Sequence, residues 1–72
     1  MPRFSDHVRR RMAERGVTEA DINMALRRRH GTEEPGGRPD TIVVRGYAAT
    51  GRSLTVVHDS ADRERVVSVW WG

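Results

Sequence analysis

The stretch His7–Val17, HVRRRMAERGV, decides the first half of the fold. Ser5 precedes it, and its hydroxyl can accept a hydrogen bond from a free N–H group of a first helical turn. Gly16 can adopt the left-handed backbone conformation that commonly ends a helix. The sequence therefore predicts a helix from about Asp6 to Arg15.

A second helix is predicted directly after Gly16. Thr18 is a suitable N-cap, and Glu19 and Asp21 in the first turn suit the positive end of the helix dipole. The arginines at positions 27–29 suit the negative end, so we expect this helix to stop near residues 30–31. Each helix carries only a narrow apolar stripe, and both must therefore pack on another element.

The second half of the chain favours β-strands. A loop rich in proline and glycine over residues 32–39 precedes three alternating segments, Thr41–Tyr47, Ser53–Asp59 and Arg65–Trp71, joined by short connections. The order predicts one α+β domain over residues 1–72, with two N-terminal helices packed on one face of a three-stranded antiparallel meander (ααβββ). The other face is expected to be fairly apolar, which favours a binding surface or a homodimer contact.

Composition and charge point to a nucleic-acid partner in the cytoplasm. All 13 basic residues are arginines. Up to Gly31, eight arginines and four acids give a net charge of +4, whereas the remainder has five arginines and six acids, a net charge of −1. A localised positive field suits a surface that meets phosphates, so RNA is the predicted partner. The chain has no cysteine, no signal-peptide pattern and no apolar run of about 20 residues, so we expect no membrane contact.

The most informative side chains are His7, Arg11 and Arg15, which recur at every fourth position. On a helix this spacing stacks one imidazole and two guanidinium groups along one ridge. Metal-free RNA cleavage needs a base for the 2′-hydroxyl proton, an acid for the leaving oxygen and cations for the charge on phosphorus. The alternative is a solvated face on which the arginines pair with nearby acids.

Further candidates lie on the second helix and the predicted strands. Arg45, in the middle of a strand, can clamp a phosphate or simply end in water. His58 can act as a second acid or base if Asp59 orients it, and its placement can equally be coincidental. Trp70 can stack on a base, or serve as a core residue or dimer anchor. The predicted nucleic-acid contacts are Arg11, Arg15, Arg27, Arg28, Arg45 and Trp70.

The motif HxxxRMxxRGV over residues 7–17 also carries a resemblance. Together with Thr18–Ile22, a later glycine-bounded strand pair and a Val-rich C-terminal strand, it resembles a family of small bacterial proteins. That family is a domain of unknown function often grouped with RelE-like and barnase-like toxin nucleases. The resemblance implies a helix-plus-meander domain and RNA cleavage.

We therefore predict a toxin-like ribonuclease that needs no metal or cofactor, since no metal-ligand spacing such as HxxxH or HExxH occurs. Its predicted catalytic residues are His7, Arg11, Arg15, Arg45 and His58. The alternative is a non-catalytic module that binds nucleic acid, or whose sheet face binds an antitoxin-like protein or a second copy of the chain.

Overall fold

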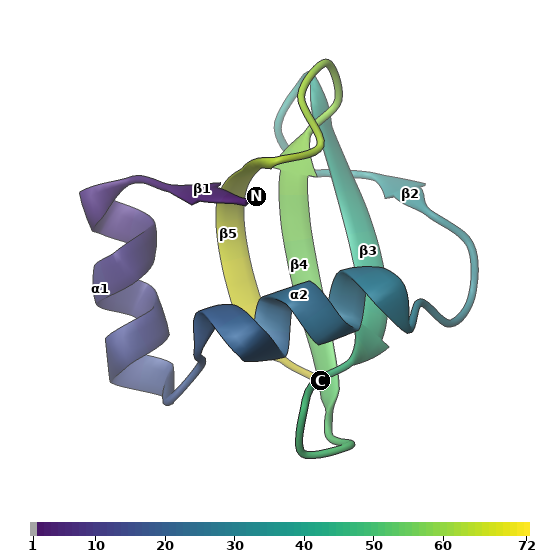
Figure 1. Cartoon of the computed structure of the whole chain (residues 1–72). Helices are drawn as coiled ribbons and strands as arrows, with labels where there is room; N and C mark the ends of the chain where they lie inside the picture. Colours follow the sequence, from purple (N-terminus) through teal and green to yellow (C-terminus); the bar gives the residue numbers. More distant parts are fainter. Residues whose placement is uncertain (1) are drawn as a thin grey trace.

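A computed structural model of the chain describes residues 2–72. Its elements are, in order, β1 (Arg3–Phe4), α1 (Asp6–Arg15), α2 (Glu19–Arg27), β2 (Glu34–Pro35), β3 (Thr41–Tyr47), β4 (Ser53–Asp59) and β5 (Arg65–Trp71). The strands form one sheet in the order β1-β5-β4-β3-β2, with α1 beside β5 and α2 across β3 and β4 (Figure 1). Neither helix in this part of the chain is long and apolar enough to cross a membrane.

The predicted three-stranded antiparallel meander is wrong, because the sheet has five strands and is mixed. β1 runs parallel to β5, with Arg3 opposite Arg65. β2 pairs antiparallel with β3 at the other edge, with Pro35 opposite Ile42. Both added strands are two residues long, and two residues are too few for an alternating pattern to reveal. Both helices do precede the three long strands.

Side-chain caps set the helix starts. The Ser5 hydroxyl accepts a hydrogen bond from the Val8 N–H at 3.2 Å, and Gly16 ends α1 in the left-handed conformation (φ 67°, ψ 31°). At α2, the Thr18 hydroxyl accepts from the Asp21 N–H at 3.1 Å, while the Asp21 carboxylate accepts from the Thr18 N–H at 3.0 Å. This reciprocal pair is a capping box, and it fixes the turn between the helices.

α2 ends earlier than residues 30–31, the end that the sequence predicts. Its last residue is Arg27, because residues 28–30 turn away to pair with the outer edge of β3. The Tyr47 N–H donates to the Arg28 carbonyl at 3.1 Å, and the His30 N–H donates to the Arg45 carbonyl at 2.9 Å. These bonds satisfy the outer backbone groups of β3 at residues 45 and 47, whereas β2 pairs only with residues 42 and 43.

One apolar cluster joins both helices to one face of the sheet. Its buried members are Val8, Met12, Val17, Ile22, Ala25, Ala48, Leu54, Val56, Val66 and Val69. α2 approaches β3 so closely that a Cβ atom built on Gly46 would fall on the backbone carbonyl of Ala25. Only glycine fits this contact without displacing the helix.

The opposite face of the sheet, here called the open face, is not covered by a helix in residues 2–72. Strand alternation and register place on it Thr41, Val43, Arg45, Tyr47, Ser53, Thr55, Val57, Ser68 and Trp70. Tyr47 and Trp70 are the two large hydrophobic side chains described as exposed, at 45% and 40%. The open face therefore carries polar side chains together with two valines and two aromatic rings.

Truncating the core should destabilise the domain much more than truncating a surface arginine. Met12 is 5% exposed, so Met12→Ala is expected to lower the free energy of unfolding by about 2–4 kcal/mol. Arg28→Ala removes an exposed side chain and should cost less than about 0.5 kcal/mol. Urea unfolding of both variants measures the difference, and equal midpoints would contradict this description of the core.

Candidate functional site

Two adjoining cavities lie where α1 begins. The first, of about 430 Å³, is lined by Arg3, Phe4, Ser5, His7, Arg38, Arg65, Val66 and Val67. The second, of about 300 Å³, extends over the open face and is lined by His7, Gly37, Arg38, Thr41, Val57, Val67, Ser68 and Trp70. Because His7, Arg38 and Val67 line both, we treat the cavities as one surface depression and call it the His7 cleft.

The position of His7 follows from the way α1 is attached to β5. β1 pairs with the start of β5, and α1 begins two residues after β1, so the first turn lies beside that strand. At the other end of α1, the Arg15 guanidinium donates to the Val69 carbonyl at 2.6 Å. The Trp71 indole N–H donates to the Arg15 carbonyl, also at 2.6 Å. His7 is thus held at the rim of the open face, with its side chain exposed.

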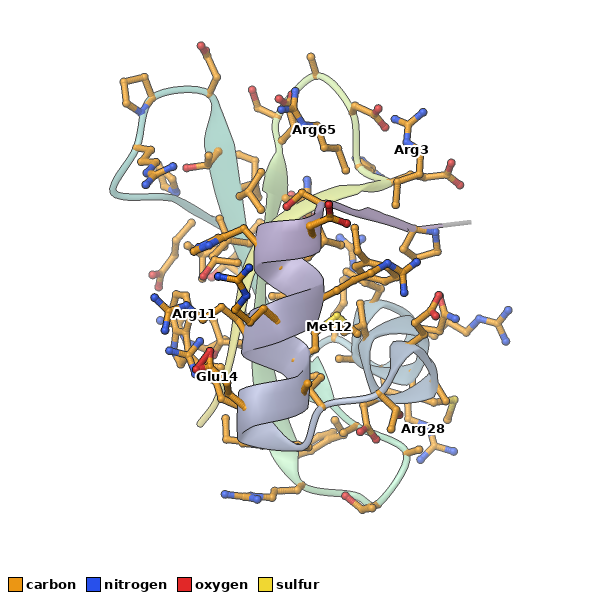
Figure 2. The ribbon with its side chains drawn as sticks, turned by 90° about the vertical axis from the view of Figure 1, so that its left-hand side faces the viewer. Arg3, Arg11, Met12, Glu14, Arg28 and Arg65 are labelled. Atoms are coloured by element: carbon orange, nitrogen blue, oxygen red, sulfur yellow. The ribbon has the colours of Figure 1, made fainter. Side chains whose placement is uncertain are left out.

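Three arginines from different parts of the chain line the cleft around this imidazole. Arg3 and Arg65 are opposite each other in the β1–β5 pair, and Figure 2 shows both at the end of the molecule where α1 begins. Arg38 comes from the loop before β3, and the Thr41 hydroxyl holds that loop by donating to the Arg38 carbonyl at 2.6 Å.

The cleft is electrostatically suited to an anion. Arg3 forms an ion pair with Asp62, whereas Arg38 and Arg65 form no ion pair within residues 2–72. No carboxylate side chain is among the residues that line the cleft. Unpaired guanidinium groups beside an exposed imidazole favour a phosphate ester, which accepts paired hydrogen bonds from arginine.

The three residues of the predicted ridge do not share one site. His7 lines the cleft, whereas Arg11 and Arg15 are not among the residues that line it. Arg11 lies 3.7 Å from the Glu14 carboxylate, and Figure 2 shows both on the side of α1 away from Arg28. Arg15 is committed to the Val69 carbonyl, so it serves to fasten α1 to β5. The four-residue spacing is real, but the three side chains have different environments.

The remaining candidates are dispersed. Arg45 is on the open face, and its guanidinium lies 3.3 Å from the Glu34 carboxylate. His58 is 2% exposed, and its Nδ1 donates to the Asp59 carbonyl at 2.7 Å, so the ring faces the protein interior. Arg27 and Arg28 are exposed at the end of α2, outside the cleft lining. Trp70 lines the cleft beside Ser68.

Sequence reasoning missed Arg3, Arg38, Arg65 and Ser68 as members of the site. Arg3 and Arg65 come together only because β1 pairs with β5, and a two-residue strand leaves no periodic signal. Arg38 lies in a segment whose proline and glycine content indicates a loop without indicating where the loop folds. Within residues 2–72, no group of three His, Asp or Glu side chains is placed to hold a metal ion.

Comparison with known proteins identifies the family. The family model of a domain of unknown function, DUF4258, matches residues 4–71. No curated protein and no solved structure matches the chain. The family match runs from residue 4 to residue 71, so it includes His7, Arg38 and Arg65 of the cleft but not Arg3. This chain belongs to the DUF4258 family of domains.

Proposed function

We propose that the domain binds RNA in the His7 cleft and cleaves its phosphodiester backbone, with His7 as the proton acceptor. The observation that carries this proposal is one exposed imidazole in a cleft that three arginines and no carboxylate line. Imidazole is the side chain best suited to proton transfer near neutral pH. Guanidinium groups are suited to the charge that develops on phosphorus.

The proposed reaction is an internal transfer at phosphorus. His7 takes the proton of the ribose 2′-hydroxyl, whose oxygen then forms a bond to phosphorus while the bond to the 5′-oxygen breaks. The leaving oxygen takes a proton from water in the open cleft, and the resulting hydroxide takes the proton from His7, which restores the neutral imidazole. The products are a 2′,3′-cyclic phosphate and a 5′-hydroxyl. Arg38 and Arg65 stabilise the extra negative charge on phosphorus.

The proposal includes a bacterial, cytoplasmic and toxin-like role, in which an antitoxin-like protein restrains the activity. The resemblance of residues 7–17 to proteins grouped with RelE-like nucleases supports this role, and the absence of cysteine is compatible with a reducing compartment. The homodimer predicted from the sequence stays a prediction, which sedimentation of the purified protein can test.

A second candidate function is RNA binding without cleavage. It is favoured by the presence of only one imidazole among the residues that line the cleft, because many metal-free ribonucleases need both a base and an acid. The two functions share the same surface and differ in whether His7 transfers a proton. They are separated by the products formed from RNA.

The direct test is to incubate the purified wild-type protein with a mixed RNA pool, with and without a chelator. We expect cleavage in both samples and fragments that end in a 2′,3′-cyclic phosphate. Because an antitoxin-like partner can copurify, the protein is refolded from denaturant before the assay. Failure to cut or bind any RNA after this step would refute both candidate functions.

The cleft arginines should control affinity. Arg38→Ala and Arg65→Ala are each expected to weaken RNA binding about 3- to 10-fold, and to reduce the slope of log K against log salt by about 1. Arg27→Ala, which removes an arginine outside the cleft, is the matched control and should leave both quantities nearly unchanged. Titrations at several salt concentrations provide the measurement. Equal losses for all three variants would show that only the overall charge matters.

A further inference from the structure

The open face carries aromatic side chains beyond the His7 cleft. Trp70 on β5 lines the cleft and is 40% exposed, whereas Tyr47 on β3 is 45% exposed. Arg45, Thr55 and Trp70 lie in one row across the three central strands, and Tyr47 follows two residues farther along β3. The two rings thus lie on one face of the sheet, with Thr55 and Ser53 of β4 between them.

We infer that this face binds single-stranded RNA, with Trp70 and Tyr47 each stacking on one unpaired base while the backbone enters the His7 cleft. This inference rests on the proposed function and names its substrate class. In a duplex the flat faces of the bases are already stacked, so only an unpaired strand can offer them to aromatic side chains.

The spacing of the rings suits two separate nucleotides. Trp70 and Tyr47 are two strands apart, about 10 Å, and offset by two residues, about 7 Å, which places their Cα atoms roughly 12 Å apart. This separation greatly exceeds the spacing of about 3.4 Å between stacked bases. One base therefore cannot occupy both rings, and the strand must cross β4 near Thr55 and Ser53 between them.

The surroundings of Tyr47 hold its ring in place. The His30 ring packs against it with a centroid distance of 4.6 Å, and His30 Nε2 lies 3.3 Å from the Ser53 hydroxyl oxygen. Because its neighbours already restrict the tyrosine ring, stacking a base on it costs little side-chain entropy. The segment after α2 thus pairs with the edge of β3 and also holds the Tyr47 ring through His30.

Charge on this face favours an anionic partner over a basic or neutral one. Arg38, which forms no ion pair within residues 2–72, lines the cleft together with Trp70, and His7 lies at the rim. The nearby carboxylates are already engaged: Glu34 with Arg45, and Asp59 with the N–H groups of residues 61 and 62 at 2.8 and 3.2 Å. A strand that combines phosphates with flat bases matches this arrangement of cations and rings.

The test uses an RNA strand that cannot be cut. A 2′-O-methyl dodecanucleotide lacks the attacking hydroxyl, so binding is measured apart from cleavage. We expect it to quench the tryptophan fluorescence of the wild-type protein, and to bind at least tenfold more tightly than the same strand annealed to its complement.

The two tryptophans supply an internal control. The Trp71 indole N–H is bonded to Arg15, and its ring packs under the Arg52 guanidinium group at 4.4 Å, so it should report little of the binding. Trp70→Phe is therefore expected to abolish most of the quenching, while Trp70→Ala and Tyr47→Ala each weaken binding about tenfold. Tyr47→Phe retains the ring and should bind like the wild type. Thermal unfolding confirms that each variant is folded.

The outcomes distinguish the inference from the proposed function. Equal affinity for strand and duplex, or unchanged binding by Trp70→Ala and Tyr47→Ala while Arg38→Ala weakens it, overturns base stacking and leaves the cleft proposal standing. A concentration-dependent dimer that Trp70→Ala dissociates, without RNA binding, also overturns the inference. Quenching and strand preference without any cleavage of unmodified RNA support the inference and remove only the catalytic part of the proposed function.

Discussion

Replacing His7 by alanine is expected to reduce the rate of RNA cleavage by about 10²–10⁴-fold, the usual loss when a positioned acid or base is removed. His7 is exposed and is absent from the apolar core, so its removal should leave the stability of the domain nearly unchanged. Single-turnover cleavage of a labelled RNA, together with thermal unfolding, measures both effects.

His7→Gln is the matched control for this experiment. Glutamine retains a polar side chain that can donate and accept hydrogen bonds, but it does not transfer protons near neutral pH. If His7 is the proton acceptor, both variants should lose activity to a similar extent while still binding RNA. If both cut RNA at the wild-type rate, His7 is not the proton acceptor, and the cleft serves only to dock the RNA.

Gly46→Ala is expected to lower the free energy of unfolding by about 3 kcal/mol, which is a large fraction of the stability of a domain this small. The added Cβ would fall on the Ala25 backbone carbonyl, and a helix backbone cannot rotate away as a flexible side chain can. The α2 helix would have to move off β3, and this would open the core between them.

Gly37→Ala is the control for backbone entropy. A Cβ at Gly37 meets no atom within 4 Å, and its backbone does not require a positive φ angle. This change should therefore be neutral or stabilise the domain by up to about 1 kcal/mol, because alanine restricts the unfolded chain. Urea unfolding measures both variants. A midpoint for Gly46→Ala equal to that of the wild type would contradict the close approach of α2 to β3.

The parts of the fold that sequence predicted correctly are those that local chemistry determines. Ser5 and Gly16 delimit α1, and the alternation of branched residues locates β3, β4 and β5 at their observed bounds. The capping box at α2 can also be predicted from the sequence, because Thr18 and Asp21 have the spacing that the motif requires. These signals act over a few residues and need no knowledge of the tertiary structure.

The parts that sequence missed depend on contacts between distant segments. β1 and β2 are strands only because β5 and β3 lie beside them, and α2 stops at Arg27 only because residues 28–30 pair with β3. The same limit applies to the site. Spacing on one helix grouped Arg11 and Arg15 with His7, whereas pairing of β1 with β5 groups Arg3 and Arg65 with it.

The attachment of α1 to β5 has a consequence for aggregation. Beyond its short pairing with β1, β5 would present free backbone groups to solvent, and such an edge can recruit strands from other molecules. The Arg15 guanidinium occupies the Val69 carbonyl on that strand, and α1 lies alongside it. At the other border of the sheet, the edge strand β2 contains Pro35, which has no backbone N–H group to offer to another strand. The folded domain thus shields both borders of its sheet against edge-to-edge polymerisation.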